Sequence, residues 1–180
     1  MAGEQRLVGP FPEGADHDEY DRLRRRILWS LPSGLYVLGT RAGGRRNLMT
    51  LNWATQVAVE PKLVAVSVEV AAVSHGLLRD GRVFSLNIVA REQRALVRKF
   101  VKPLDDTGEP DRLAEFGLRA SVTGSPILAA ASAWLDCELR HDVACGSHTL
   151  FVGEVVDCGA DADAGLEVLR MEDTRMSYGG

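Results

Sequence analysis

The sequence predicts a mainly β protein: an antiparallel barrel with short helices attached to it. The order of elements is the first reason, because about seven strand-like segments are interrupted by only three helical ones, without regular strand–helix alternation. The second reason is the segment 47–59, which is long for a strand in a small domain and is expected to bend or wrap. The eighteen glycines also suit a barrel with many tight turns.

The N-terminal part is expected to differ from the rest. Residues 1–17 carry Gly, Pro and charge without periodicity, which predicts a loose arm before a single domain at 18–180. Asp16 or Asp18 can cap a helix that ends at Pro32-Ser33-Gly34. The apolar residues of this helix recur at helical spacing: Tyr20, Leu23, Ile27, Leu28 and Leu31.

The strands are expected at 35–40, 47–59, 62–69, 82–89, 133–143 and 147–157, with a short one near Val168-Leu169. Gly43-Gly44 and Ala144-Cys145-Gly146 are expected to form turns, and Pro61 to end the long strand. Short helices are expected at 74–80, with Ser74 as N-cap, and at 91–101. Residues 102–125 are rich in Pro, Gly and Asp, which predicts a loop with at most short helical pieces.

Charge and composition argue against several classes of protein. The net charge of −4 offers no basic surface, so nucleic acid is not an expected partner. No segment approaches the roughly 18 continuous apolar residues of a membrane span, and no apolar leader is visible, which predicts a cytoplasmic protein without membrane contact. Three widely spaced cysteines favour free thiols over a disulfide framework.

Motifs for common nucleotide and hydrolase sites are missing: GxGxxG, GxxxxGK[ST], HExxH and GxSxG do not occur. His141, Cys145 and His148 form an HxxxCxxH run, but it supplies three ligands without an obvious fourth, so no metal site is predicted. Cys145 is not expected to act as a nucleophile either, because nothing nearby in sequence would orient the His148 imidazole. The residues by themselves therefore predict a mostly β protein and no particular function.

Several segments, taken in order, resemble the flavin reductase family, whose members fold as FMN-binding split β-barrels. The resemblance implies an antiparallel split β-barrel and a homodimer with the cofactor near the subunit interface. The spacing at Ser74-His75 is similar to the flavoredoxin-like and ferric-reductase-like branch, whereas the segment at Pro61 departs from the family pattern by carrying a single proline. The matching segments are GLYVL at 34–38, NLMTLNW at 47–53, EPKLVAVS at 60–67, SHGLL at 74–78 with RVFSLN at 82–87, WLDC at 134–137 and GSHTLFVGEV at 146–155.

This resemblance implies a site for FMN, with FAD as the alternative flavin, reduced by NAD(P)H. A flavin needs backbone amides for the polar edge of its ring, an apolar wall for its face and donors for its phosphate. Thr50 and Asn52 share one face of their strand and could contact the ribityl chain and phosphate, or could be ordinary surface polar residues. The amides that end the strand 62–69 could meet the ring, or could simply end a strand. The expected cofactor contacts are Asn47, Met49, Thr50, Leu51, Asn52, Trp53, Ser67, Val68, Glu69, Ser74, His75, Leu78 and Lys99.

Ser74-His75 at a helix N-terminus is the preferred phosphate contact, with a plain N-cap as the alternative. Lys99, beside Arg98, could add positive charge or could lie on a solvated helix face. His148 is the expected catalytic residue beside the ring, where it would position nicotinamide or polarise the reduced flavin; the alternative is a structural histidine. The tail residues Met176, Ser177 and Tyr178 could cover the cofactor or form a frayed end.

Three functions are consistent with the resemblance. The first is an NAD(P)H:flavin oxidoreductase that supplies electrons to free flavin, a monooxygenase partner or another acceptor. The second is an FMN-binding electron carrier without its own NAD(P)H site, since no nicotinamide fingerprint separates the two. The third is a binding module with an exchanged cofactor such as heme, which Trp53 and the missing proline at position 62 keep open.

Overall fold

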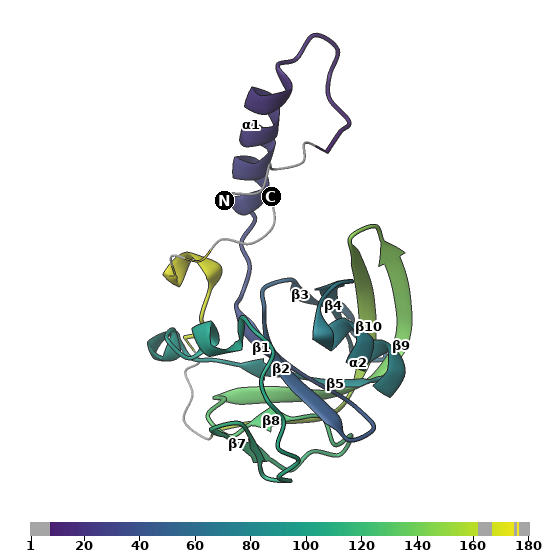
Figure 1. The fold of residues 1–180 in the computed structure, drawn as a ribbon, viewed down its shortest axis with the longest axis vertical. Helices are drawn as coiled ribbons and strands as arrows, with labels where there is room; N and C mark the ends of the chain where they lie inside the picture. Colours follow the sequence, from purple (N-terminus) through teal and green to yellow (C-terminus); the bar gives the residue numbers. More distant parts are fainter. Residues whose placement is uncertain (1–7, 162–166, 175, 177–180) are drawn as a thin grey trace. The chain divides into compact units, whose positions relative to one another are not determined.

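The computed structural model describes residues 8–161, 167–174 and 176 of the chain (Figure 1). Among the helices described there, none combines the length and the apolar character needed to cross a membrane. The helices are α1 (His17–Trp29) and α2 (Val73–Gly81), with 3₁₀ turns η1 (Arg91–Gln93), η2 (Val97–Phe100) and η3 (Met171–Asp173). The strands are β1 (Tyr36–Ala42), β2 (Arg45–Leu51), β3 (Ala54–Ala58), β4 (Leu63–Glu69), β5 (Val83–Ile88), β6 (Arg112–Leu113), β7 (Phe116–Arg119), β8 (Ile127–Leu128), β9 (Ala133–Cys145) and β10 (His148–Ala160).

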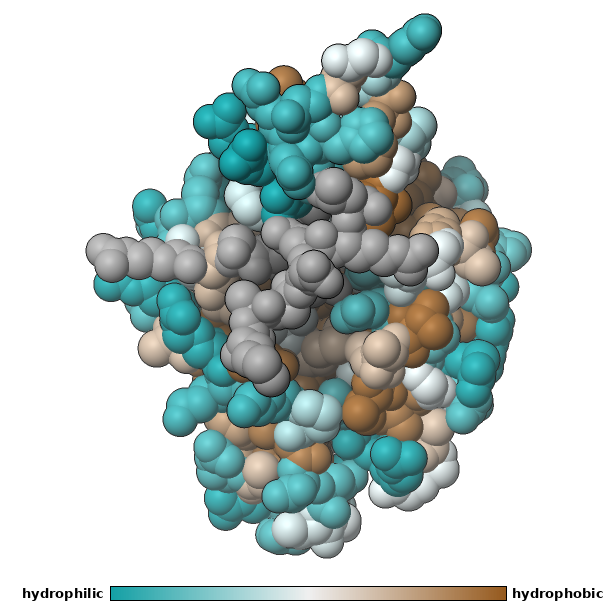
Figure 2. Space-filling model, turned by 45° about the horizontal axis from the view of Figure 1, so that its top comes forward, coloured by the Kyte–Doolittle hydropathy of each residue, from teal (hydrophilic) through white to brown (hydrophobic). Residues whose placement is uncertain are grey.

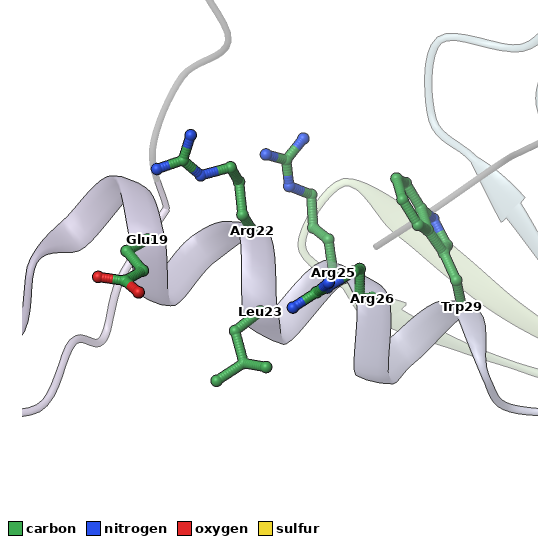
Figure 3. Close-up of a pocket in the computed structure, with 6 residues that line it drawn as sticks. All are labelled: Glu19, Arg22, Leu23, Arg25, Arg26 and Trp29. Atoms are coloured by element: carbon green, nitrogen blue, oxygen red, sulfur yellow. The ribbon is translucent and has the colours of Figure 1, made fainter.

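The chain divides into two compact units, 1–32 with 175–180 and 33–174. In the first unit, Asp16 caps α1 as predicted, because its carboxylate accepts a hydrogen bond of 2.9 Å from the Glu19 amide. The helix ends at Trp29, before the expected Pro32-Ser33-Gly34. A hollow of about 510 Å³ runs beside α1 (Figure 3). The described residues that line it are Glu19, Arg22, Leu23, Arg25, Arg26 and Trp29, none of which was predicted for a cofactor site.

The second unit is built on one antiparallel sheet of seven strands in the order β2-β1-β5-β9-β10-β4-β3. Its two edge strands, β2 and β3, are consecutive in the chain and are separated only by Asn52 and Trp53. The expected long strand 47–59 therefore breaks at this corner and reaches both edges, which curls the sheet into an open barrel. The predicted fold class, an antiparallel split barrel with short helices, is confirmed.

The barrel interior is apolar and densely packed. Leu38, Val66, Phe84 and Phe151 are at most 1% exposed and come from four different strands. Burying a side chain of this size contributes about 1.5–3 kcal/mol to folding. Helix α2 packs against this core through Leu78, which is fully buried. The long hairpin of β9 and β10, drawn in green in Figure 1, runs past α2 with its tip projecting from the barrel.

Two predicted segments differ from the structure. The prediction of a helix at 91–101 is wrong. Only the 3₁₀ turns η1 and η2 form there, because hydrogen bonds to distant residues hold the backbone at Arg91 and at Val97. The Arg91 amide donates to Glu167 (2.8 Å), and the Val97 carbonyl accepts from the Thr50 hydroxyl. The loop expected at 102–125 contains β6 and β7, which pair with β8 in a small three-stranded sheet. The tail strand near Val168-Leu169 is present as isolated bridges.

Arg46 of β2 anchors the loop that follows η2. Its guanidinium bonds both carboxylate oxygens of Asp106, at 2.7 and 3.2 Å, and donates to the carbonyls of Glu109 and Arg112 at 2.8 and 2.9 Å. Both side chains are less than 15% exposed. The hydrogen bond from Arg46 and the charge of its guanidinium lower the pKa of the Asp106 carboxyl.

Candidate functional site

The corner between β2 and β3 places Trp53 beside the end of β4. The Ser67 amide donates to the Trp53 carbonyl at 2.9 Å, which ties the corner to β4 just before the pairing of β3 with β4 begins at Ala54 and Val66. The Trp53 side chain is 36% exposed. Part of this large aromatic residue is thus exposed at the barrel surface.

His148, the first residue of β10, lies on the same surface. It is the register partner of Glu69, the last residue of β4, and its ring centre is 5.0 Å from that of Trp53, with the planes tilted by 54°. Its Nδ1 lies 2.9 Å from the Ser147 hydroxyl. Two rings predicted to serve the cofactor, 95 residues apart in sequence, are therefore brought into contact.

Apolar side chains extend this surface beyond Trp53 and His148. Val70 follows β4 and is 52% exposed, and Val73 at the start of α2 is 38% exposed. The Val70 amide bonds the Ser147 carbonyl at 3.0 Å, which holds this segment beside His148. Figure 2 shows brown, hydrophobic patches interrupting a largely teal surface. Neither valine was predicted, because single valines in a strand-rich sequence carry no signal for a site.

The end of β4 also supplies a backbone group that suits the polar edge of a flat ligand. The Ser67 amide is not free as expected, because Trp53 uses it. Strand alternation points the Glu69 amide to the same edge, two residues beyond the place where β3 stops covering it. The Val68 side chain is buried at 1% exposure, so only its backbone could reach a ligand.

The predicted N-cap role of Ser74 is wrong. Helix α2 begins at Val73 with Ala72 as its N-cap, and the Ser74 side chain is fully buried. Its hydroxyl accepts from Asn47 Nδ2 at 3.0 Å and lies 3.2 Å from the Thr40 hydroxyl, while Asn47 Oδ1 accepts from the Leu104 amide at 3.3 Å. These bonds join β1, β2, α2 and the loop that follows η2. A phosphate at the start of α2 would have to be held by the Val73 and Ser74 amides, because the His75 amide already donates to the Ala72 carbonyl at 3.0 Å.

The other predicted contacts lie partly in the barrel core and partly on its surface. Met49, Leu51 and Leu78 pack in or against the barrel core, and Asn52 is 7% exposed at the corner. The Thr50 hydroxyl donates a hydrogen bond to the Val97 carbonyl, and this bond holds η2 against β2. Lys99 on η2 is exposed, as is Arg98. The ligand contacts expected of these residues stay predictions. Met176 engages in contacts of its own, while Ser177 and Tyr178 lie outside the described residues.

His75 lies in the first turn of α2 with its ring directed into the protein. Its side chain is 9% exposed, and Nε2 lies 2.8 Å from the Thr149 hydroxyl. Burial, together with the nearby charge of Arg79, lowers the pKa of His75, and Asp142 opposes that shift. Thr149 was not among the predicted site residues. Strand alternation along β10 predicts that Thr149 and His148 face opposite sides of the sheet. It cannot predict that Thr149 lies beside His75, which is 74 positions away in the sequence.

The HxxxCxxH run is spread along the hairpin. His141 is the register partner of Val152, whereas Cys145 is that of His148. Within the described ranges, no three side chains of His, Cys, Asp or Glu lie close enough to hold a metal ion.

The described part of the chain is thus an open antiparallel barrel that brings an aromatic ring, a histidine and exposed valines to one strand end. The family model described as "Flavin reductase like domain" matches residues 28–179, and the chain belongs to this family. The resemblance predicted from the sequence motifs is thereby confirmed.

Three relatives cover most of this chain. The NADH-dependent FAD reductase of Streptomyces globisporus is 31% identical over 154 residues, which are 83% of this chain and 81% of that protein. The NADH-dependent flavin reductase StyB of Pseudomonas fluorescens is 32% identical over 137 residues, 75% of this chain and 76% of that protein. The reductase component of the flavin-dependent trigonelline monooxygenase of Acinetobacter baylyi is 28% identical, over 87% of this chain and 50% of that protein.

The solved structure of the NADH:FAD oxidoreductase SgcE6 of Streptomyces globisporus C-1027 matches with a TM-score of 0.74 at 26% identity, over 94% of this chain and 98% of that one. Several other curated relatives are longer proteins. The chain spans between 24% and 59% of the length of four of them.

Proposed function

We propose that this chain is a homodimeric NAD(P)H:flavin oxidoreductase that holds FMN against the ends of β4 and β10. The observation that carries the proposal is the meeting of Trp53 and His148 beside the uncovered Glu69 amide. An apolar wall, a polar backbone edge and one titratable ring are the features that a flavin ring and a nicotinamide need. The relatives named as NADH-dependent flavin and FAD reductases support the same reading.

Each group would have a distinct task. Trp53, with Val70 and Val73, would shield one side of the ring from water, and the Glu69 amide would donate to its polar edge. Backbone amides of the first turn of α2 would hold the phosphate, with Lys99 adding positive charge. His148 would orient the nicotinamide by hydrogen bonding. The bound flavin would supply the redox chemistry by accepting a hydride and passing on its electrons.

Anaerobic titration of the purified protein tests this function. FMN and FAD are added first, with flavin fluorescence as the measure of binding, and then NADH or NADPH is mixed in a stopped-flow instrument. We expect quenching of flavin fluorescence and bleaching of the flavin absorbance with at least one nicotinamide. Bleaching with neither would exclude a reductase and leave an electron carrier. A heme spectrum of the protein as purified would reveal an exchanged cofactor.

The dimer is proposed on the exposed edge of the sheet. β3 is an edge strand, and Val57 and Val59 are 50% and 72% exposed on and just after it. An uncovered apolar edge invites pairing with another copy. Light scattering should give twice the 19.6 kDa mass of one chain. A monomer at micromolar concentration would contradict this part of the proposal.

We also propose a monooxygenase as the acceptor of the reduced flavin, and the cytoplasm as the location, where nicotinamide donors are plentiful. The relative named as a monooxygenase reductase component supports the acceptor. Free diffusion of reduced flavin can be separated from direct transfer by enclosing the reductase and a flavin-dependent monooxygenase on opposite sides of a dialysis membrane. Product formed across the membrane would show that the flavin itself is the carrier.

A further inference from the structure

His75 of α2 and His148 of β10 lie on opposite sides of the strand at the point where β10 begins. The His75 ring is on the inner side, where its Nε2 is 2.8 Å from the Thr149 hydroxyl and its edge meets the Phe151 ring at 5.2 Å. His148 precedes Thr149 in β10, so its side chain points to the other face, where it contacts Trp53. A single peptide bond connects the residue that α2 holds with the residue that faces the proposed flavin.

The main chain where β10 begins is held by its ladder with β4 and by the bond from the Val70 amide to the Ser147 carbonyl at 3.0 Å, whereas the hairpin beyond it is exposed. Residues 140–147 are all exposed. The ion pair of Arg82 with Asp142, at 2.8 Å, is nearly half exposed on both sides, and pairs of this kind contribute little rigidity or stability. The part-buried contact of His75 with Thr149 adds a side-chain bond from α2 to this strand end, at the point where β10 leaves the packed barrel.

The surroundings favour a neutral His75 ring at neutral pH. Burial disfavours the charged imidazolium, and Arg79 on the same helix adds to this effect, while Asp142 of β9 opposes it. A neutral ring offers one donor and one acceptor, and either can pair with a hydroxyl. Thr149 fits this role because it can accept or donate in return.

We propose that His75 is a positioning residue of the reductase site: through the Thr149 hydroxyl it fixes the strand end from which His148 meets the nicotinamide. The inference rests on the proposed function and deepens it. It assigns the His75 side chain to the support of His148, and it leaves any contact of α2 with the cofactor to the backbone. Misplacing a positioned group by about 1 Å can cost up to about a hundredfold in rate, so a support of this kind has a measurable effect.

Four variants test the contact. Thr149→Val removes the hydroxyl at nearly constant shape, and His75→Phe removes the ring nitrogens but keeps a ring. Thr149→Ser and His75→Gln keep a hydroxyl and a terminal nitrogen, and serve as rescue variants. Thr107→Val is the matched control, because it removes a threonine hydroxyl that bonds only Glu109 at an exposed position.

The first readout needs no flavin. The ring resonances of His148 are followed by NMR in the flavin-free protein, with His148→Asn for assignment. We expect Thr149→Val and His75→Phe to shift or broaden these signals, and both rescue variants to restore them. Unchanged His148 signals in the folded Thr149→Val variant would overturn the proposal. Because Thr149→Val removes only one hydroxyl, it decides the matter even where His75→Phe does not fold.

The second readout separates positioning from cofactor binding. We expect Thr149→Val to lower kcat/KM for the nicotinamide by about tenfold while the Kd for FMN changes by less than about threefold. A large rise in the Kd for FMN with normal hydride transfer would show that His75 serves the cofactor directly, and would overturn the proposal. Failure of the wild-type protein to react with any nicotinamide would count against the proposed function, and the NMR measurement would still decide the role of His75.

Discussion

The rings of Trp53 and His148 are 5.0 Å apart, although the two residues come from the corner between the edge strands and from the tip of the longest hairpin. The contact lies beside Glu69, the last residue of β4, which is the register partner of His148. It gives the proposed flavin site an apolar wall and a titratable ring on one face.

Replacing His148 tests the catalytic assignment. His148→Ala should lower kcat/KM for the nicotinamide by about 10- to 100-fold, because the variant removes the group proposed to orient it. The Kd for FMN should change little. His141→Ala, on the same hairpin and exposed, is the matched control and should behave as wild type. Equal effects of the two variants on kcat/KM would mean that hairpin stability, and not the ring, is being measured.

Removing Asp106 should destabilise the protein by about 2–4 kcal/mol, because the largely buried Arg46 guanidinium would lose its charged partner. Urea unfolding of Asp106→Ala measures the loss. Asp80→Ala is the control: it breaks the exposed pair with Arg79, which is more than 60% exposed on both sides. Exposed pairs contribute at most about 1 kcal/mol. A cost for Asp106→Ala no larger than that of the control would show that the anchor is weak.

The same carboxylate predicts an acid dependence of stability. The hydrogen bond from Arg46 lowers the pKa of Asp106, so the unfolded chain takes up its proton at higher pH than the folded protein. The stabilisation is therefore complete above the ordinary carboxyl pKa of about 3.9 and is lost as the pH falls through the lowered native value. The free energy of unfolding should fall less steeply below about pH 4 in Asp106→Ala than in wild type. Parallel pH profiles would refute the assignment.

Replacing each of two glycines by alanine should change the stability of the protein in opposite directions. A methyl group at Gly39 of β1 would collide with the Pro126 carbonyl and the Ser85 hydroxyl, so Gly39→Ala should cost about 2 kcal/mol or more, or prevent folding. Gly76 lies in α2 with open space around it, and alanine there should be neutral or stabilise by up to about 1 kcal/mol. Thermal unfolding of both variants provides the comparison. A destabilised Gly76→Ala would indicate that something covers α2 in solution.

The three thiols should differ in reactivity. Cys137 is fully buried, and burial raises its pKa to about 12, so almost no thiolate is present at neutral pH. Cys145 and Cys158 are exposed. Ellman's reagent should label two thiols quickly in the native protein and the third only after unfolding. Rapid labelling of all three would contradict the packing around β9.

The local elements and the family follow from the amino-acid sequence. Alternation and turn residues located the main strands and the Gly43 turn, because strand period and turn chemistry act over a few neighbouring residues. The break of the expected strand 47–59 at Asn52 and Trp53 was not predicted. Tertiary structure alone decided which side chains meet. Ser74 bonds Asn47 across 27 residues, His75 bonds Thr149 across 74, and Leu78 packs in the core. These contacts depend on which distant strands pair and how far the sheet curls, and that is set by the packing of the whole barrel.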